Sequence, residues 1–341
     1  MRLAGALVLI LVLVPAAAAG SPARTGYPNS MGVIGDSWET GFATNSALPP
    51  ADVAANNWAT GTSPVVDSFY SRILAANPRI KGNVYNVAHD GDASADFESQ
   101  AERLPAHLDF VLEALGGNSF CPALKLSFFR GDMAAGMKAL SRAEPDARIL
   151  MIGIGGVEPF WDAGGTGSAD VREQLTDPRG VGACDPKFDA SGVPAPAQVT
   201  LLHQQEDVYN GVLESICAQY VHCRWDGPGF DGIDLQLSDI SPLDAGHPSP
   251  SGAAKMAASI WAGNFDFTDT SAPVSKAHRS GSRVTLTATD AQGVSGIEYR
   301  LTASGPWTRY AKPLTLKKGK TLTWRAVDVN GNVEASHSLK G

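Results

Sequence analysis

The feature that most constrains the fold of this chain is an alternation of short apolar runs with helical stretches, from about residue 29 to residue 265. Five apolar runs are predicted as strands: residues 31–35, 83–88, 108–115, 148–154 and 221–225. Apolar residues at helical spacing predict helices at residues 65–74, 125–141, 199–220 and 249–261. Strands that alternate with helices indicate a parallel sheet covered on both faces, and such sheets bind ligands at the carboxyl ends of their strands.

One segment interrupts this alternation. Residues 161–197 are rich in Gly, Asp and Pro and contain Cys184. We predict a long loop here, held by that cysteine. It either borders a substrate cleft or is a plain surface excursion.

A second structural unit begins after Phe267, where the helical patterns stop. Residues 284–289, 296–301, 307–310 and 321–327 are predicted as short strands separated by turn sequences such as Asn330-Gly331-Asn332. Regular short strands with Gly and Asn turns indicate a small β-sandwich. We therefore expect an α/β domain at residues 27–266 and an all-β domain at residues 269–341.

The charge distribution supports this boundary. The formal net charge is −8, which argues against general nucleic-acid binding. From Ser271 to the end there are 11 Lys and Arg against 4 Asp and Glu, a balance of +7. The preceding residues carry 16 against 31, a balance of −15. A sign change of this size is typical of two domains.

The N-terminus predicts a secretory signal peptide over residues 1–22. Met1-Arg2 is followed by an apolar run from Leu3 to Val14 and then by small residues. The run is too short for a spanning helix, and no later segment approaches the necessary length. We expect a secreted protein with no transmembrane segment.

Four cysteines fit an oxidising compartment: Cys121, Cys184, Cys217 and Cys223. Three connectivities are open. Cys217 and Cys223 are close enough to join a helix end to the following strand, which favours the pairs 217–223 and 121–184. Neither a Cys-x-x-Cys motif nor a His/Cys zinc spacing occurs, so we expect no metal and no cofactor.

Two short motifs carry the chemistry of a serine nucleophile. Gly35-Asp36-Ser37 follows the first strand, and Asp244-Ala245-Gly246-His247-Pro248 comes about two hundred residues later. A serine hydroxyl needs a histidine to take its proton, and the histidine needs a carboxylate to hold its tautomer. Asp244 and His247 are three residues apart, so both can lie on one turn.

An acyl-transfer site also needs hydrogen-bond donors for the developing oxyanion. Two strand ends offer them. Gly91, in His89-Asp90-Gly91, can present a backbone N–H, and Asn118, in Gly116-Gly117-Asn118, can present a side-chain amide. The similar turn at Gly153-Ile154-Gly155-Gly156 lacks an amide side chain. The Gly-x-Ser-x-Gly elbow of other serine hydrolases does not occur.

With these motifs in place, the chain resembles the SGNH hydrolases, also called GDSL esterases and lipases. The resemblance spans nearly the whole first domain. It implies a flavodoxin-like three-layer α/β/α sandwich, with Ser37 as nucleophile, His247 as general base and Asp244 as the residue that orients it. It also implies an oxyanion hole formed by the N–H groups of Ser37 and Gly91 and the side chain of Asn118.

The chain departs from the family pattern at two positions. Ser119 follows the oxyanion-hole asparagine where the family usually has Asp, so support of that loop is expected to differ. Trp38 follows the nucleophile where leucine is common, and a bulky ring there would narrow or line the acyl site. Three further aromatic residues are candidates for lining an acyl pocket: Phe160, Trp161 and Trp225.

The C-terminal segment resembles a bacterial Ig-like module of secreted and surface enzymes. The resemblance depends on residues 284–290, on Gly296-Ile297-Glu298-Tyr299-Arg300 and on Arg325-Ala326-Val327-Asp328. It implies a non-catalytic accessory module. Its positive balance favours anionic polymers or cell surfaces as partners, and a simple spacer is the alternative.

These features together predict a secreted serine ester hydrolase that acts on small-molecule, lipid or acylated-carbohydrate esters without a cofactor. Two alternatives stay open. A carbohydrate deacetylase would use the same site, and a non-catalytic surface-binding protein would retain only the fold.

Overall fold

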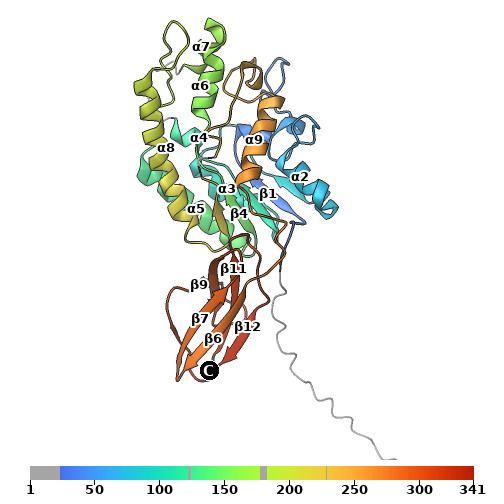
Figure 1. Ribbon diagram of the computed structural model, residues 1–341, viewed down its shortest axis with the longest axis vertical. Coiled ribbons are helices and arrows are strands. Elements are labelled where there is room, and N and C mark those ends of the chain that lie inside the picture. The colour runs from blue at the N-terminus through green and yellow to red at the C-terminus, as the bar shows by residue number, and fades with distance from the viewer. Residues whose placement is uncertain (1–23, 122–123, 177–182, 228) are drawn as a thin grey trace, which may run out of the picture.

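The computed structural model describes residues 24–121, 124–176, 183–227 and 229–341. The predicted signal peptide, residues 1–22, lies outside these ranges. The described chain forms two bodies, an α/β part in the upper half of Figure 1 and an all-β part below it.

The α/β part is built on a sheet of five parallel strands: β1 Met31–Ile34, β2 Val84–Asn86, β3 Phe110–Glu113, β4 Arg148–Met151 and β5 Cys223–Trp225. The strand order is β2-β1-β3-β4-β5. This is the flavodoxin-like order, so the predicted fold class is confirmed.

Helices cover both faces of the sheet. Met31 and Val33 point to one face, where α2 (Phe69–Ala76) and α9 (Pro250–Gly263) pack. Ile34 points to the other, which is covered by α3 (Phe97–Arg103), α5 (Leu126–Ala143) and α8 (Pro196–Cys217). Strands β1, β3 and β4 are buried along their whole length, as expected for a sheet between two helical layers.

Several elements are shorter than the strands and helices predicted from sequence, or lie at different positions. The helix predicted at 65–74 begins only at Phe69, because the Ser68 hydroxyl accepts the Ser71 N–H at 3.1 Å and caps the first turn. Seven short elements were not predicted: α1 Ser37–Thr40, α3 Phe97–Arg103, α4 Gly117–Phe120, η1 Ala54–Asn56, η2 Pro78–Ile80, η3 Ser94–Asp96 and η4 Leu237–Asp239.

The prediction of a long loop at residues 161–197 is wrong for the part up to residue 175, whereas residues 183–195 form no helix or strand and are held by the Cys121–Cys184 disulfide, as expected. Helix α6 runs over Val157–Gly165 and helix α7 over Ala169–Leu175. The glycines that suggested a loop allow close packing instead. A Cβ atom on Gly164 would lie 2.1 Å from Leu175 Cδ1, and one on Gly165 would lie 2.1 Å from the Gly192 carbonyl oxygen.

The all-β part consists of two antiparallel sheets, ordered β10-β7-β6 and β12-β11-β8-β9. Their buried faces meet in one core, with Val284 and Leu286 opposite Ile297 and Trp324. The strands are β6 Val274–Ser280, β7 Arg283–Thr289, β8 Val294–Arg300, β9 Thr308–Arg309, β10 Leu314–Thr315, β11 Thr321–Asp328 and β12 His337–Lys340. Strands β6, β10 and β12 were not predicted, because most of their side chains are exposed and they carry no apolar alternation.

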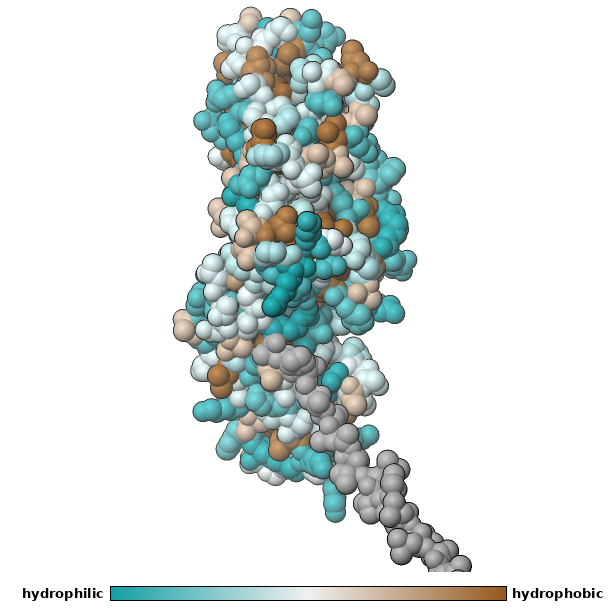
Figure 2. Space-filling model, turned by 90° about the vertical axis from the view of Figure 1, so that its right-hand side faces the viewer, coloured by the Kyte–Doolittle hydropathy of each residue, from teal (hydrophilic) through white to brown (hydrophobic). Residues whose placement is uncertain are grey.

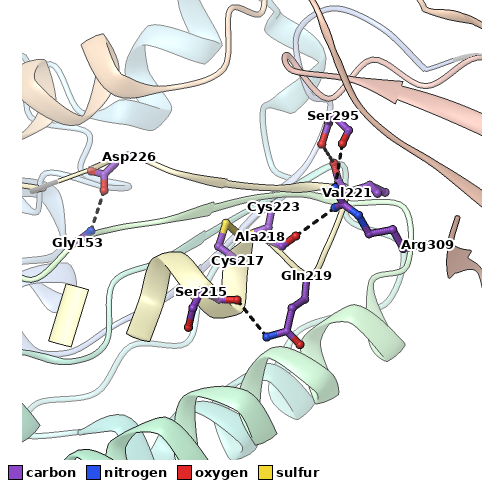
Figure 3. The surroundings of a disulfide bond; sticks show 10 residues. All are labelled: Gly153, Ser215, Cys217, Ala218, Gln219, Val221, Cys223, Asp226, Ser295 and Arg309. Atoms are coloured by element: carbon purple, nitrogen blue, oxygen red, sulfur yellow. Dashed lines mark hydrogen bonds between the residues drawn. A yellow bond between two sulfur atoms is a disulfide. The ribbon is translucent and has the colours of Figure 1, made fainter. Parts of the chain in front are cut away.

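The structure contains two disulfides, Cys121–Cys184 and Cys217–Cys223, which is the pairing favoured from the sequence. The second joins the end of α8 to the start of β5 (Figure 3). The first joins the residue after α4 to the segment that leads into α8.

Buried arginines hold the two bodies together. Arg325 of β11 is 1% exposed and forms ion pairs with Asp146 before β4 and with Glu298 of β8. Arg148 donates to the Gly331 carbonyl oxygen at 3.1 Å and to the Asn332 side chain at 3.0 Å. The second body is therefore docked on the N-terminal ends of β4 and β5.

Backbone contacts complete this interface. The Ser295 hydroxyl donates to the Val221 carbonyl oxygen, and Arg309 donates to that of Ala218 (Figure 3). Arg24, close to the start of the described chain, pairs with Val333 by two backbone hydrogen bonds. The first described residues are thus bonded directly to the C-terminal body.

On the face shown in Figure 2, hydrophobic residues lie scattered among hydrophilic ones. Among the residues that the structure describes, no helix has the length and apolarity needed to span a bilayer.

Candidate active site

Ser37 is the first residue of α1, immediately after the turn that follows β1. A capping box shapes this turn: the Asp36 side chain accepts the Trp38 N–H at 3.2 Å, and the Glu39 side chain accepts the Asp36 N–H at 2.9 Å. A Cβ atom at position 35 would lie 2.3 Å from Glu39 Oε2. Only glycine at this position leaves room for the box that directs Ser37 away from the sheet.

His247 and Asp244 are within hydrogen-bond distance of this serine. His247 Nε2 lies 2.8 Å from Ser37 Oγ, and His247 Nδ1 lies 2.7 Å from Asp244 Oδ2. The other carboxylate oxygen of Asp244 accepts the backbone N–H of His247 at 3.2 Å. The turn is also anchored outside itself, since the Ser241 hydroxyl donates to the Ala43 carbonyl oxygen at 2.7 Å.

The three expected oxyanion donors are not equally close to this serine. Ser37 and Asn118 both line the cavity at the serine, whereas Gly91 is exposed and does not line it. Gly91 has a φ of 79°, a left-handed conformation that favours glycine. The side-chain amide of Asn118 donates to Asp36 Oδ2 at 3.1 Å and to the Asp92 carbonyl oxygen at 2.9 Å. Asn118 must exchange one of these partners to bind an oxyanion.

Ser119 supports the Gly91 loop through hydroxyl groups. Its Oγ accepts the Ser94 N–H at 2.9 Å and donates to Ser94 Oγ at 2.9 Å. Ser94 Oγ in turn donates to Asp132 of α5 at 2.9 Å. These hydrogen bonds connect the loop of Asn118 to the loop of Gly91 without an aspartate at position 119.

Buried carboxyl groups lie directly beneath the serine. Burial raises the pKa of Asp36 to about 6, against the opposing effects of the Trp38 N–H and of His247. Burial also raises the pKa of Glu39 well above its usual range, although its side chain accepts from the Trp58 indole at 2.7 Å. Burial raises the pKa of Glu113, at the end of β3, to about 8.

Ser37 lines a cavity of about 410 Å³, one wall of which is formed by aromatic side chains. The ring of Trp38 stacks on that of Phe160 at 5.4 Å and meets Phe230 edge-on at 5.4 Å. Trp161 lines the same cavity. Of the three aromatic residues predicted to line an acyl pocket, Phe160 and Trp161 line this cavity. The prediction for Trp225 is wrong, because Trp225 lines a different cavity on the far side of α6.

The described residues contain one group of carboxylates able to hold a metal ion, and it lies in the all-β part. Oxygens of Asp269, Asp290 and Asp328 lie within 4.8 Å of one another. Each of these side chains already accepts backbone or amide hydrogen bonds from its own turn or a neighbouring one. The group is far from the serine in the fold and is explained as a set of turn-stabilising carboxylates.

Three further residues shape the site and were not predicted to do so. Asp36 contacts the Asn118 amide, Phe42 meets the His247 ring edge-on at 5.1 Å, and Phe230 contacts Trp38. The role of Asp36 had a signal in the sequence, because Asp36 and Glu39 have the spacing of a capping box. Phe42 and Phe230 had none, because only the tertiary fold brings His247 to Phe42 and Phe230 to Trp38.

No family model matches the chain, and no curated protein matches it. Solved structures of lipases and esterases are similar to it in fold. The chain shares 14% identity with phospholipase A1 from Streptomyces albidoflavus NA297, with 70% of this chain and 99% of that one covered and a TM-score of 0.44.

Two further structures are similar at the same level. An extracellular lipase from Streptomyces rimosus is 16% identical over 68% of this chain and 98% of its own, with a TM-score of 0.42. TesA is 18% identical over 69% of this chain and 97% of its own, with a TM-score of 0.39. At these identities the role of each residue has to be derived from the chain's own geometry.

Replacing Glu113 by glutamine is expected to change how stability depends on pH. The carboxyl keeps its proton to about pH 8 in the folded protein but loses it near pH 4.5 when unfolded. The folded state then binds more protons, so this group makes stability fall as pH rises through that window. Glu113→Gln should gain unfolding free energy relative to the wild type between pH 5 and pH 8, measured by urea denaturation. The exposed Glu102→Gln is the control, and a difference that does not vary with pH would contradict the expectation.

Replacing Asn118 by alanine is expected to lower the turnover number for an ester substrate by about two to three orders of magnitude, with a smaller effect on KM. The reason is the role expected for the Asn118 amide as a donor to the developing oxyanion. Steady-state kinetics on a 4-nitrophenyl ester measure it, with the exposed Asn83→Ala as control. A loss of less than about threefold would remove Asn118 from the oxyanion hole.

Proposed function

We propose that the chain is a secreted serine carboxylic ester hydrolase of the SGNH type, working through an acyl-enzyme on Ser37. The observation that carries the proposal is the unbroken relay from Asp244 through His247 to Ser37, with both heavy-atom distances below 3 Å. Ser37 and His247 both line the cavity with the aromatic wall. Nucleophile, base and orienting carboxylate at these distances are the requirements for acyl transfer.

In the first half of the reaction, Ser37 Oγ attacks the ester carbonyl carbon and its proton passes to His247 Nε2. Asp244 accepts the Nδ1–H of His247, which holds the tautomer and stabilises the imidazolium that forms. The tetrahedral intermediate then collapses. The alcohol leaves with the proton from His247, and the acyl group stays on Ser37.

In the second half, His247 takes a proton from water, which attacks the acyl-enzyme carbonyl carbon. The bond from the acyl carbon to Ser37 Oγ then breaks, the acid is released, and His247 returns the proton to Ser37 Oγ. The oxyanion in both halves is stabilised by donors fixed beforehand. The Ser37 N–H and the Asn118 amide are the donors nearest the reacting atoms. The Gly91 N–H is the third donor of the proposed oxyanion hole, although Gly91 does not line the cavity.

The aromatic wall of the cavity favours a substrate whose acyl group is longer and more apolar than acetyl. Trp38, Phe160 and Phe230 offer a surface that a two-carbon group would leave mostly uncovered. An acylated carbohydrate is the alternative, and in that case the sugar lies outside the aromatic wall. A binding protein without catalysis has less support, because binding alone requires no histidine within hydrogen-bond distance of the serine.

Three further assignments belong to the proposal. Residues 1–22 are a signal peptide, and the two disulfides support an oxidising destination. Residues 27–266 form the hydrolase domain, and residues 269–341 form an Ig-like accessory domain. The excess of basic residues in that domain predicts binding to anionic polymers. Arg325 does not contribute to such binding, because it is already ion-paired at the interface.

Replacing Ser37 by alanine is expected to abolish ester hydrolysis while the protein stays folded, because no other group provides the acyl-enzyme. Hydrolysis of 4-nitrophenyl butyrate and covalent labelling by a fluorophosphonate are the measurements. The exposed Ser46→Ala should behave as the wild type in both. Unchanged turnover in Ser37→Ala would refute the mechanism, and failure of the wild type to label would favour a binding protein.

Replacing Phe160 by alanine is expected to reduce kcat/KM for an octanoyl ester about tenfold more than for an acetyl ester, since apolar contact with the longer chain is lost. A panel of 4-nitrophenyl esters from acetyl to octanoyl measures this ratio, with Phe128→Ala on the exposed face of α5 as control. Acetylated xylan is assayed beside the panel. A strong preference of the wild type for acetyl groups would favour the deacetylase.

A further inference from the structure

A second cavity, of about 990 Å³, lies between α6, α8 and residues 231–235. Helices α6 and α8 stand side by side in Figure 1, and His203 of α8 contacts Glu158 of α6 at 2.7 Å. This cavity shares no lining residue with the one at Ser37, although α6 forms a wall of both. Glu158 and Asp162 face the second cavity, whereas Phe160 faces the first.

The second cavity is strongly acidic. Seven of its fifteen lining residues are Asp or Glu, and none of these fifteen is Lys or Arg. His203 is the one lining side chain able to carry a positive charge, and it is already engaged by Glu158. The carboxylates therefore face one another across the cavity with little compensation, which costs stability in the empty protein.

Glu206 gives this cluster a specific target for a ligand. Its side chain lines the cavity, is only 3% exposed, and has one carboxyl oxygen, Oε1, that is buried with no hydrogen-bond partner. Burial and the negative charges of Asp231, Glu158 and Asp207 raise the pKa of Glu206 to about 8. An unsatisfied buried acceptor of this kind is rare in native proteins and is expected where a bound group completes it.

The spacing of the carboxylates argues for an organic cation rather than a metal ion. Among the described residues, the one set of three acidic, His or Cys side chains with ligand atoms within 4.8 Å of one another is in the all-β part. No three acidic, His or Cys side chains of this cavity therefore bring ligand atoms within 4.8 Å of one another. Apolar side chains, Pro159, Ile233, Leu235 and Trp225, lie among them.

We propose that this cavity binds a linear organic oligocation, a chain of two or more ammonium groups separated by methylene segments. Glu206 would release its proton to solvent as an ammonium group binds it, and the other ammonium groups would pair with the carboxylates of α6. The methylene segments would contact Ile233, Leu235 and Trp225. The site is separate from the ester reaction and does not require Ser37.

Spermidine is the probe for this site. Calorimetric titration of spermidine into the full-length Ser37→Ala protein at low ionic strength should give saturable binding that weakens with added salt. Using this variant separates the test from ester hydrolysis. Absence of binding would overturn the proposal.

Two variants locate the binding, and one controls for general charge effects. Glu206→Gln keeps the shape of the side chain and should reduce affinity by about tenfold or more, the effect of losing one hydrogen bond to a charged group. The double variant Glu158→Gln/Asp162→Asn, on the partly exposed side of α6, should reduce it similarly. Glu98→Gln, exposed on α3, should leave affinity unchanged.

The melting temperature adds a second readout for Glu206→Gln. Without spermidine this variant should melt at or above the wild-type temperature, because it removes a strained buried carboxyl, and it should gain less on adding spermidine. Equal losses of affinity in Glu206→Gln and Glu98→Gln would reduce the binding to non-specific charge attraction and overturn the site. Calcium chloride that binds more tightly than spermidine and loses affinity in Glu206→Gln would overturn the choice of ligand.

Discussion

The structure depends above all on the position of β1 inside a parallel sheet. It pairs with β2 on one side and β3 on the other, so the carboxyl ends of these strands meet at one edge. Ser37 follows β1, the Asp92 loop follows β2, and Asn118 follows β3, and the Asn118 amide contacts both Asp36 and the Asp92 carbonyl. Gly35 lets the chain turn sharply enough at this edge for Glu39 to fold back beneath the serine.

Charge is distributed in opposite ways in the two halves of the molecule. At the interface between the bodies, buried arginines are matched by carboxylates or carbonyl groups, as with Arg325 and Arg148. Around the two cavities of the α/β part, buried carboxyl groups such as Glu113 and Glu206 have an oxygen without a partner. The matched arginines hold the bodies together, whereas Glu206 lines one cavity and Glu113 directly precedes residues that line the other, where stability is commonly sacrificed for function.

Sequence patterns were most successful where burial is complete. Strands β1, β3 and β4 are buried throughout, so their apolar runs were unambiguous. Sequence patterns failed where a residue type that usually indicates a loop is used for close packing inside a helix. Gly164 and Gly165 suggested a loop but lie at the end of α6, where they admit Leu175 and the Gly192 backbone. Edge strands such as β6 and β12 were missed because solvent, rather than a core, faces most of their side chains.

The sequence by itself determined the fold class and the candidate chemistry, because hydrophobic periodicity and short motifs are local properties of the chain. It determined that a serine would follow the first strand and that an acid and a histidine would share one turn. Only the tertiary structure decided which distant groups complete the site, since packing across the sheet edge brings His247 to Ser37 and to Phe42, and Phe230 to Trp38. The acidic cavity was likewise beyond the sequence. Its carboxylates come from α6, α8 and residues 231–235, and burial, which no local pattern encodes, left the oxygen of Glu206 without a partner.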